Sequence, residues 1–348
     1  MKSRVRKAPN SMGQLLRRLS EAAGPPGRER AVRDLIRGEI GAAANEIWID
    51  GLGNLIARKA SGGKNRLRVM LAARMDEPAL IARHIDPRGF VRFDVIGPVS
   101  VAYLAGAPVR FENGVRGVIG VDAKTTAGAP SSLQNLFIDV GAPGRASCPV
   151  RIGDLAVFGD GFAEAGERWM GRAVAARAGA AILLETVRAV RRTPHELFFA
   201  FTTNNQVDGR GTATAASGIE PDVGISIDAV ASQDIPHGMQ GGIELGHGPV
   251  VLVRDAEAIS DGDVSRWIEA AARSARIPLQ RGSVLDGSLG IAGLQRAGRG
   301  ALAGALGLPA RFSHSPTEVV DRGDLANTAR LLKTLVAARF RRAQGAVA

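Results

Sequence analysis

The sequence predicts an α/β fold with a mixed sheet flanked by helices. The chain of this α/β domain is interrupted by an inserted small all-β domain that resembles a barrel. Two patterns along the 348 residues support this prediction. Short alternating apolar segments broken by Gly and Pro fill residues 79–163, which is typical of a small barrel or sandwich. A pair of helical patterns followed by strands precedes this segment, and helix and strand patterns alternate after it, which is typical of a sheet covered by helices. We therefore expect a discontinuous α/β domain, formed by residues 1–79 and 163–348, and an inserted β domain at residues 80–162.

The segment before the insert contains two helical patterns separated by Gly24-Pro25-Pro26-Gly27, a run that ends a helix and forms a turn. Two short strand patterns flank the turn Gly51-Leu52-Gly53, and a continuous apolar run follows that suits a strand buried on both faces. The elements expected here are helices at 12–23 and 28–42 and strands at 46–50, 54–58 and 67–73.

Six strands are expected inside the insert, at 80–84, 90–95, 108–111, 115–119, 136–140 and 155–158. After the insert, helix and strand patterns alternate, which favours a mixed or parallel sheet. The expected helices are 172–191, 209–217, 264–276 and 324–342, and the expected strands are 196–203 and 223–228.

Composition limits the classes of protein that this chain can belong to. With 45% hydrophobic residues, the chain can bury a large core, which excludes a disordered protein. The single Cys148 excludes a disulfide framework within the chain and a cysteine-based zinc site, and it fits a reducing, cytoplasmic compartment. No apolar stretch approaches the roughly 20 residues of a membrane span. The net charge of +11 comes mostly from scattered Arg without interleaved aromatic residues, so a nucleic-acid partner is not expected.

Five segments, taken in order, resemble metallopeptidase family 42, the tetrahedral and glutamyl aminopeptidases that assemble as dodecamers from dimers. The match covers about residues 12 to 340. The resemblance implies a zinc-aminopeptidase-like fold, and it implies that the inserted β domain mediates dimerisation. The matching segments are Ile49–Ile56 (V-D-x-L-G-N-L-I in the family), Asp76-Glu77 with the following 81–95 (H-x-D-E-I-G and a strand-turn-strand), Ile138–Gly141 (I-D-I-G), Pro221–Val223 with Asp228 (P-D-I-A-x-A-x-D) and Arg311–Pro316 (R-Y-x-H-S-P).

The resemblance implies a site with two divalent ions and a bridging water, which needs carboxylate and imidazole ligands and a Glu as general base. This chain departs from that pattern at most of these positions. Asp228 and His314 match two of the five ligands. The first His ligand falls on Arg74, the bridging Asp on Ala175, the general base on Asn205 and the next ligand on Gln206.

These replacements remove negative charge and add a permanent positive charge, because Asn and Gln cannot ionise and Arg stays protonated. We therefore expect no catalytic metal and no other cofactor; if a metal is bound, zinc, cobalt or manganese is expected. Arg74 is expected either to pair with Asp228 and Asp76 in the space of a metal ion, or to point into an open, solvated cleft. Asp76, a possible catalytic remnant, is expected to accept a hydrogen bond from Arg74.

Two further residues are candidates for the site. His314 is interpreted as a former metal ligand, with a histidine in the wall of the cleft as the alternative. Asp286 resembles the Asp of the family's G-T-D segment, so it either binds the amino group of a ligand or stabilises a turn. The candidate ligand-binding residues are thus Arg74, Asp76, Asp228, Asp286 and His314.

Three functions remain open at this point. The first is a catalytically inactive homologue, a pseudoenzyme that acts as an assembly or regulatory subunit, either as a homo-oligomer through residues 80–162 or with an active paralogue. The second is an active enzyme: a metal-dependent aminopeptidase with displaced ligands such as Glu77, Asp208 or His237, or a hydrolase or transferase of another chemistry. The third is a binding protein that holds a peptide or a small anionic molecule, the latter through Arg74.

Overall fold

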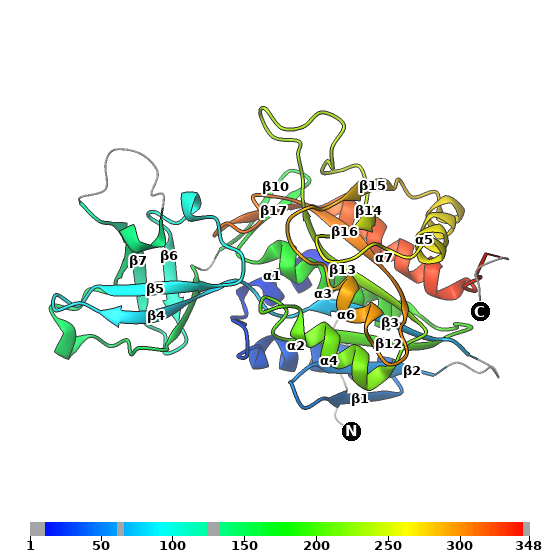
Figure 1. The fold of residues 1–348 in the computed structure, drawn as a ribbon, viewed down its shortest axis with the longest axis horizontal. Coiled ribbons are helices and arrows are strands. Elements are labelled where there is room, and N and C mark those ends of the chain that lie inside the picture. The colour runs from blue at the N-terminus through cyan, green and yellow to red at the C-terminus, as the bar shows by residue number, and fades with distance from the viewer. Residues whose placement is uncertain (1–10, 61–65, 124–131, 160, 344–348) are drawn as a thin grey trace, which may run out of the picture.

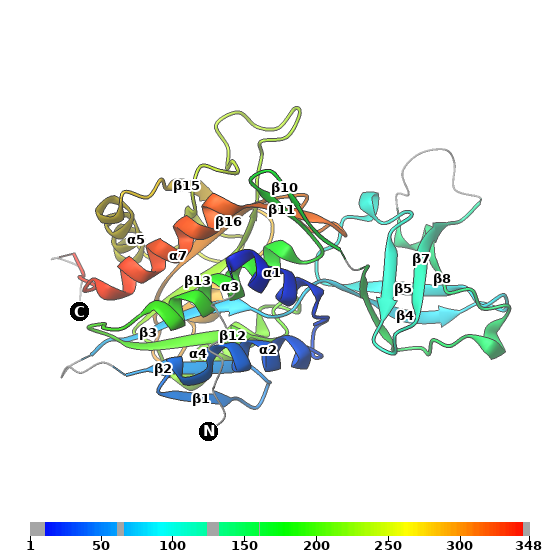
Figure 2. The same cartoon turned by 180° about the vertical axis from the view of Figure 1, so that it is seen from behind.

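The computed structural model describes residues 11–60, 66–123, 132–159 and 161–343. They form a large sheet covered by helices and, beside it, a closed six-stranded barrel (Figures 1 and 2). The predicted fold class is therefore confirmed. Within these ranges, no helix has both the length and the apolar character needed to cross a membrane.

Eleven strands of the described residues form the large sheet, nine of them in the order β1-β2-β12-β3-β13-β16-β17-β11-β10. β14 pairs with β16 and β15, away from this path. The bounds are β1 Glu46–Ile49, β2 Leu55–Lys59, β3 Arg68–Arg74, β10 Phe162–Ala165, β11 Arg168–Gly171, β12 Glu196–Thr202, β13 Val223–Ala231, β14 Val250–Arg254, β15 Gln280–Ser283, β16 Leu302–Arg311 and β17 Glu318–Asp321.

The centre of this sheet consists of four parallel strands, β12, β3, β13 and β16. Parallel strands bring their carboxyl ends to the same edge, and ligand sites of such sheets lie at that edge. Arg74 is the last residue of β3, Asn205 follows the end of β12 at Thr202, and Asp228 lies near the end of β13. The topology thus gathers residues that are more than 150 positions apart in the sequence.

Helices cover both faces of the sheet (Figures 1 and 2). Five helices pack into one hydrophobic core: α1 Met12–Glu21, α2 Arg30–Ile40, α3 Val174–Ala189, α5 Gly262–Ala275 and α7 Arg322–Ala337. Two others pack into a smaller core on the opposite face: α4 Arg210–Ile219 and α6 Ile291–Gln295.

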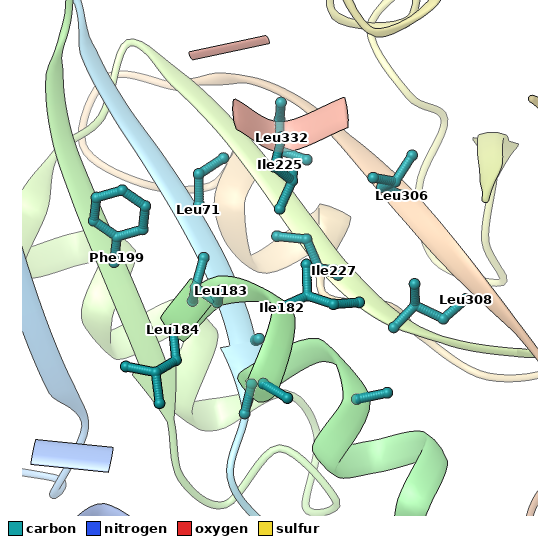
Figure 3. Packing of buried hydrophobic residues seen from close by; sticks show 14 of the residues in the cluster. Leu71, Ile182, Leu183, Leu184, Phe199, Ile225, Ile227, Leu306, Leu308 and Leu332 are labelled. Carbon is teal, nitrogen blue, oxygen red and sulfur yellow. The ribbon is translucent and has the colours of Figure 1, made fainter. Parts of the chain in front are cut away.

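Strand β3 shows why these residues form a central strand. Val69 and Leu71 belong to the larger core, whereas Met70 belongs to the smaller one, so the strand is apolar on both faces. Figure 3 shows Leu71 facing the residues around Leu183 of α3. Replacing Leu71, which is fully buried, with Ala would cost about 2–5 kcal/mol of stability.

Helix α3 lies very close to β13. A Cβ atom added at Gly179 would lie 2.7 Å from the carbonyl oxygen of Ile227. Any other residue at this position would therefore push the helix away from the strand. This close packing fixes the beginning of α3 next to the carboxyl edge of the sheet.

The barrel is closed in the order β4-β5-β8-β7-β6-β9, so it leaves no free strand edge. Its interior is a separate hydrophobic cluster that includes Phe93 and Phe111. The strands are β4 Ala79–Ile85, β5 Val91–Ile96, β6 Pro108–Phe111, β7 Arg116–Val121, β8 Leu136–Asp139 and β9 Leu155–Phe158. All six strands were predicted, with small differences at their ends.

Several elements were not predicted, namely β10, β11, β14, β15, β16, β17 and α6. The most important is β16, whose sequence Leu-Ala-Gly-Ala-Leu-Gly-Leu-Pro-Ala-Arg lacks the β-branched and aromatic residues that mark strands. It forms a strand because β13, β14 and β17 pair with it. The predicted C-terminal helix also ends earlier, at Ala337 instead of residue 342.

Candidate functional site

A pocket of about 450 Å³ opens at the carboxyl edge of the parallel strands. Charged residues from several separate segments line it together with two amides and small residues. Four of the five predicted ligand-binding residues are among them, and the fifth, Asp76, is not. The polar lining residues are Arg74, Asn205, Gln206, Asp208, Asp228, Glu257, Asp286, Ser288, Ser313, His314 and Glu318.

Arg74 forms an ion pair with Asp228, and the Nε and Oδ1 atoms are 2.9 Å apart. The two side chains are only 12% and 13% exposed, so the alternative prediction of an open, solvated cleft at Arg74 is wrong. Burial by itself would lower the pKa of Arg74, but interaction with Asp228, Asp76 and Glu318 raises it overall. The guanidinium is therefore permanently charged.

The pKa of Asp228 is set by opposing effects of burial and of its neighbours. Burial raises its pKa above the usual range, whereas Arg74 and the backbone N–H of Ala229 act to lower it. The Oδ1 atom accepts a hydrogen bond from that N–H at 2.7 Å. Without Arg74, the carboxylate would keep only this one neutral donor.

Glu318 is a third member of this cluster, and the sequence analysis missed it. It begins β17, is 5% exposed and lines the pocket. Its Oε2 atom accepts a hydrogen bond from the backbone N–H of Ala175 at 2.9 Å, at the beginning of α3. Burial raises its pKa, and Arg74 opposes this rise. The available signal was its position four residues after His314, on the way into the next strand.

Ala175 itself contributes no side chain to the pocket. Its methyl group is fully buried in the larger core, and the residue offers only its backbone N–H to Glu318. A methyl group cannot coordinate a metal, so the side chain at the position matched to the bridging Asp cannot act as a ligand.

Asn205 is held in a fixed orientation by two threonines. Its Nδ2 atom donates to the Oγ1 atoms of Thr202 and Thr212 at 2.8 and 2.9 Å, and its Oδ1 atom accepts from the backbone N–H of Thr212 at 3.0 Å. A neutral amide engaged in this way has no basic site for a proton. Asn205 cannot replace a general base.

Asp76 has a different partner from the predicted one. Its Oδ2 atom accepts a hydrogen bond from the backbone N–H of Gln206 at 2.6 Å, and its Oδ1 atom has no hydrogen-bond partner among the described residues. The predicted hydrogen bond from Arg74 is absent there. Asp76 is fully buried, and burial raises its pKa to about 7 despite the opposing effect of Arg74. Its role is to hold the segment that carries Gln206.

His314 lines the pocket in a strained backbone conformation. Its φ angle is +67°, and Phe312, Asn204 and Asp208 have φ angles of +56°, +51° and +60°. Non-glycine residues rarely adopt these values, and such residues concentrate at functional sites. Burial and the neighbouring Arg74 both lower the pKa of His314, so its imidazole is neutral near pH 7.

A sequence profile of M42 glutamyl aminopeptidases matches residues 53–331, which is most of the chain. The chain belongs to the M42 glutamyl aminopeptidase family.

Relatives and solved structures agree with this assignment. The chain is 29% identical to the lysyl aminopeptidase of Pyrococcus furiosus, with 93% of this chain and 96% of that protein covered. It is 31% identical to aminopeptidase APDkam598 from the archaeon Desulfurococcus kamchatkensis, with a TM-score of 0.89 over 94% of this chain and 95% of the other. The TET1 peptidase of Pyrococcus horikoshii, which can assemble into a tetrahedron or a large octahedral shell, is 27% identical with a TM-score of 0.83 over 94% and 99%.

The residues of this M42 chain do not fit the two divalent ions that the family resemblance implies. Of the positions matched to metal ligands, only Asp228 and His314 carry side chains that coordinate metals, and Asp228 is already paired with Arg74. The described residues contain no group of three or more His, Cys, Asp or Glu that could hold a metal ion. A guanidinium inside the cluster also repels a dication.

The displaced ligands considered above do not converge in this M42 structure. Glu77 accepts hydrogen bonds from Arg177 Nη2 and the backbone N–H of Gly24, both at 2.9 Å, and it forms an ion pair with Arg172. Its carboxylate is thus committed to these partners. Asp208 lines the pocket, whereas His237 does not.

Three exposed carboxylates, Asp208, Glu257 and Asp286, surround the mouth of the pocket. None of them forms an ion pair within the described ranges. Together with Asp228 and Glu318, they outnumber Arg74, the single Lys or Arg side chain among the described residues that line this pocket. The pocket of this M42 protein is therefore acidic.

Proposed function

We propose that this M42 protein is a non-hydrolytic member of its family, a pseudoenzyme that binds a ligand in the pocket and does not cleave it. The observation that carries this proposal is the ion pair between Arg74 and Asp228, located where the family pattern expects two metal ligands. The position of the general base supports it, because Asn205 is a neutral amide fixed by Thr202 and Thr212. Among the described residues, neither the general-base Glu of the family pattern nor its set of metal ligands is present, so the water activation that the resemblance implies lacks both of its groups.

The form of the pocket favours ligand binding over a purely structural role. The strained φ angles at Asp208 and His314 cost energy, and both residues line a cavity that remains open. A volume of about 450 Å³ is in the range of small-molecule sites. We infer that the geometry serves a ligand although the groups for hydrolysis are replaced.

The charges favour a ligand with a free ammonium group, such as the amino terminus of a short peptide. Arg74 is engaged by Asp228 and interacts with Glu318, so its charge is not available to an incoming anion. The exposed Asp208, Glu257 and Asp286 leave the mouth of the pocket negative. The earlier prediction of a small anionic ligand is therefore the less favoured one.

We further propose that the chain forms a homo-oligomer, with residues 80–162 as the dimerisation domain. The tetrahedral and octahedral assemblies of the Pyrococcus horikoshii relative support this proposal. Co-assembly with an active paralogue is the alternative, and light scattering with and without the paralogue distinguishes the two. The single Cys148 supports a cytoplasmic location.

An active metal-dependent aminopeptidase is the second candidate, because Asp228 and His314 are retained and the Pyrococcus furiosus relative is named a lysyl aminopeptidase. The test combines two measurements on the purified chain with added zinc, cobalt or manganese. Short peptides and lysine amide are titrated by calorimetry, and the same mixtures are analysed for cleavage by mass spectrometry. We expect binding without cleavage, weakened by Asp286→Asn; metal-dependent turnover would contradict the proposal.

A further inference from the structure

We infer that the Arg74 guanidinium is a built-in cation of the site, which neutralises the carboxylates that remain there and makes a metal ion unnecessary. This inference rests on the proposed non-hydrolytic function. It goes beyond that function because it assigns Arg74 a positive role, whereas loss of activity alone requires only that ligands be absent.

Acidic side chains are arranged around Arg74. Asp228 lies 2.9 Å from Nε, and Glu318 and Asp76 interact with the same guanidinium electrostatically. Asp228 and Glu318 are both largely buried. A carboxylate taken out of water without a cation is strongly destabilising. The cluster therefore requires a positive charge at this position.

Arg74 is the one Lys or Arg side chain that lines the pocket among the described residues. Arg172 and Arg177 lie nearby in sequence to the beginning of α3, but both are committed to Glu77. Within the described part of the chain, no second Lys or Arg thus lines the pocket to replace Arg74.

Arg311 offers a matched control for Arg74 within the same sheet. Like Arg74, it is the last residue of a central strand, and it pairs with an acid, Asp234, with Nε and Oδ1 3.2 Å apart. Its side chain is 30% exposed, however, and Asp234 is a single partner on a loop. Arg311 therefore represents an ordinary ion pair at a strand end, whereas Arg74 serves several buried acids.

The test is chemical rescue of Arg74→Ala by methylguanidinium at millimolar concentration, with sodium chloride at equal ionic strength as the control. Thermal midpoints are measured for the full-length wild-type chain, Arg74→Ala, Arg74→Lys and Arg311→Ala. We expect the thermal midpoint of Arg74→Ala to lie several degrees below that of wild type. Methylguanidinium, but not sodium chloride, should restore part of this difference. Wild type and Arg311→Ala should show no such gain, and Arg74→Lys, which keeps a cation, should lose less than Arg74→Ala.

Two outcomes would overturn the inference: a midpoint of Arg74→Ala equal to that of wild type, or equal responses of Arg74→Ala and Arg311→Ala to methylguanidinium. If Arg74→Ala does not fold, Arg74→Met combined with Asp228→Asn answers the same question, because the double variant should be more stable than Arg74→Met. A double variant less stable than Arg74→Met would contradict the inference. These results are independent of peptide cleavage, so a failure here is distinguishable from a failure of the proposed function.

Discussion

Two buried clusters of arginine and carboxylate contain residues that are close in the sequence, Arg74 and Glu77, and they serve different purposes. In the first, Glu77 binds Arg172 and Arg177, and all three side chains are at most 2% exposed. This cluster joins the beginning of α3 to the loop at Gly24. In the second, Arg74 binds Asp228 and interacts with Glu318 at the floor of an open pocket.

The Glu77 cluster maintains the fold, whereas the Arg74 cluster lies where the family pattern expects metal ligands. Ala175 and Arg177 lie two positions apart at the beginning of α3. Arg177 completes the closed cluster, whereas Ala175, at the position matched to the bridging Asp, places only a methyl group in the larger core. Mutation of the closed cluster is thus expected to cost stability that no added cation restores. In the open cluster, a small cation from solution is expected to replace the missing guanidinium in part.

The largest effect is expected for Arg177→Met. The substitution keeps an unbranched side chain of similar length but leaves the buried Glu77 with one ion-pair partner, Arg172. Breaking a buried pair in this way costs about 3–5 kcal/mol of unfolding free energy, which urea denaturation measures. Methylguanidinium should not restore this loss because the cluster is closed to solvent. Rescue of Arg177→Met would break the distinction between the two clusters.

Asp76→Asn is expected to change how stability depends on pH. The folded state holds a proton on Asp76 up to about pH 7, whereas the unfolded chain releases it near the ordinary value of 3.8. The contribution of Asp76 therefore falls as the pH rises from about 4 to about 7, by up to about 4 kcal/mol. The neighbouring Glu29 acts in the same direction as burial, and Arg74 and Arg177 oppose it.

Urea denaturation of Asp76→Asn and wild type from pH 5 to pH 8 tests this expectation. The variant should gain stability relative to wild type as the pH rises, because the amide stays neutral and can still accept the hydrogen bond from the N–H of Gln206. Parallel pH profiles of the two proteins would show that Asp76 does not titrate as described.

Glu318→Gln is expected to have a smaller effect of about 1–2 kcal/mol. The amide oxygen can still accept the hydrogen bond from the N–H of Ala175, but one charge that interacts with Arg74 is lost. Asp228 remains as the main partner of Arg74. The thermal midpoint of Glu318→Gln should therefore fall clearly less than that of Arg177→Met. An equal fall would mean that the open cluster contributes as much to stability as the closed one.

The smallest effect is expected for Arg83→Ala. Its ion pair with Asp94 on the barrel is 3.7 Å long, and both side chains are more than half exposed. Such pairs contribute about 0–1 kcal/mol because water and salt screen them. A larger change in the unfolding free energy, measured by urea denaturation, would mean that the contribution of an ion pair to stability does not increase with its burial. The contrast between the two clusters depends on that increase.

The sequence predicted much of the fold because its strongest patterns are local. The apolar run of β3 and the alternating barrel strands were recognisable from residue type and spacing. The strand β16 was not, because its Ala, Gly and Leu residues form a strand only through pairing with β13, β14 and β17. Pairing between distant segments leaves no local signal.

The candidate site was predictable where a residue could be matched to a motif. The pairing of Arg74 with Asp228 was one of two alternatives that the sequence left open, and the observed ion pair favours it. The partner of Asp76 and the role of Glu318 were missed, because both depend on how loops at the sheet edge fold back. Exposure and side-chain direction in such loops are set by tertiary contacts, which the sequence alone does not reveal.

The most direct test of the central claim is equilibrium dialysis against zinc followed by elemental analysis, on wild type and on a variant that combines Arg74→His, Ala175→Asp, Asn205→Glu and Gln206→Glu. We expect negligible zinc in wild type, since Arg74 supplies the positive charge of the site, and close to the roughly two ions per chain of a dinuclear centre in the variant. Near-stoichiometric zinc in wild type would contradict the account.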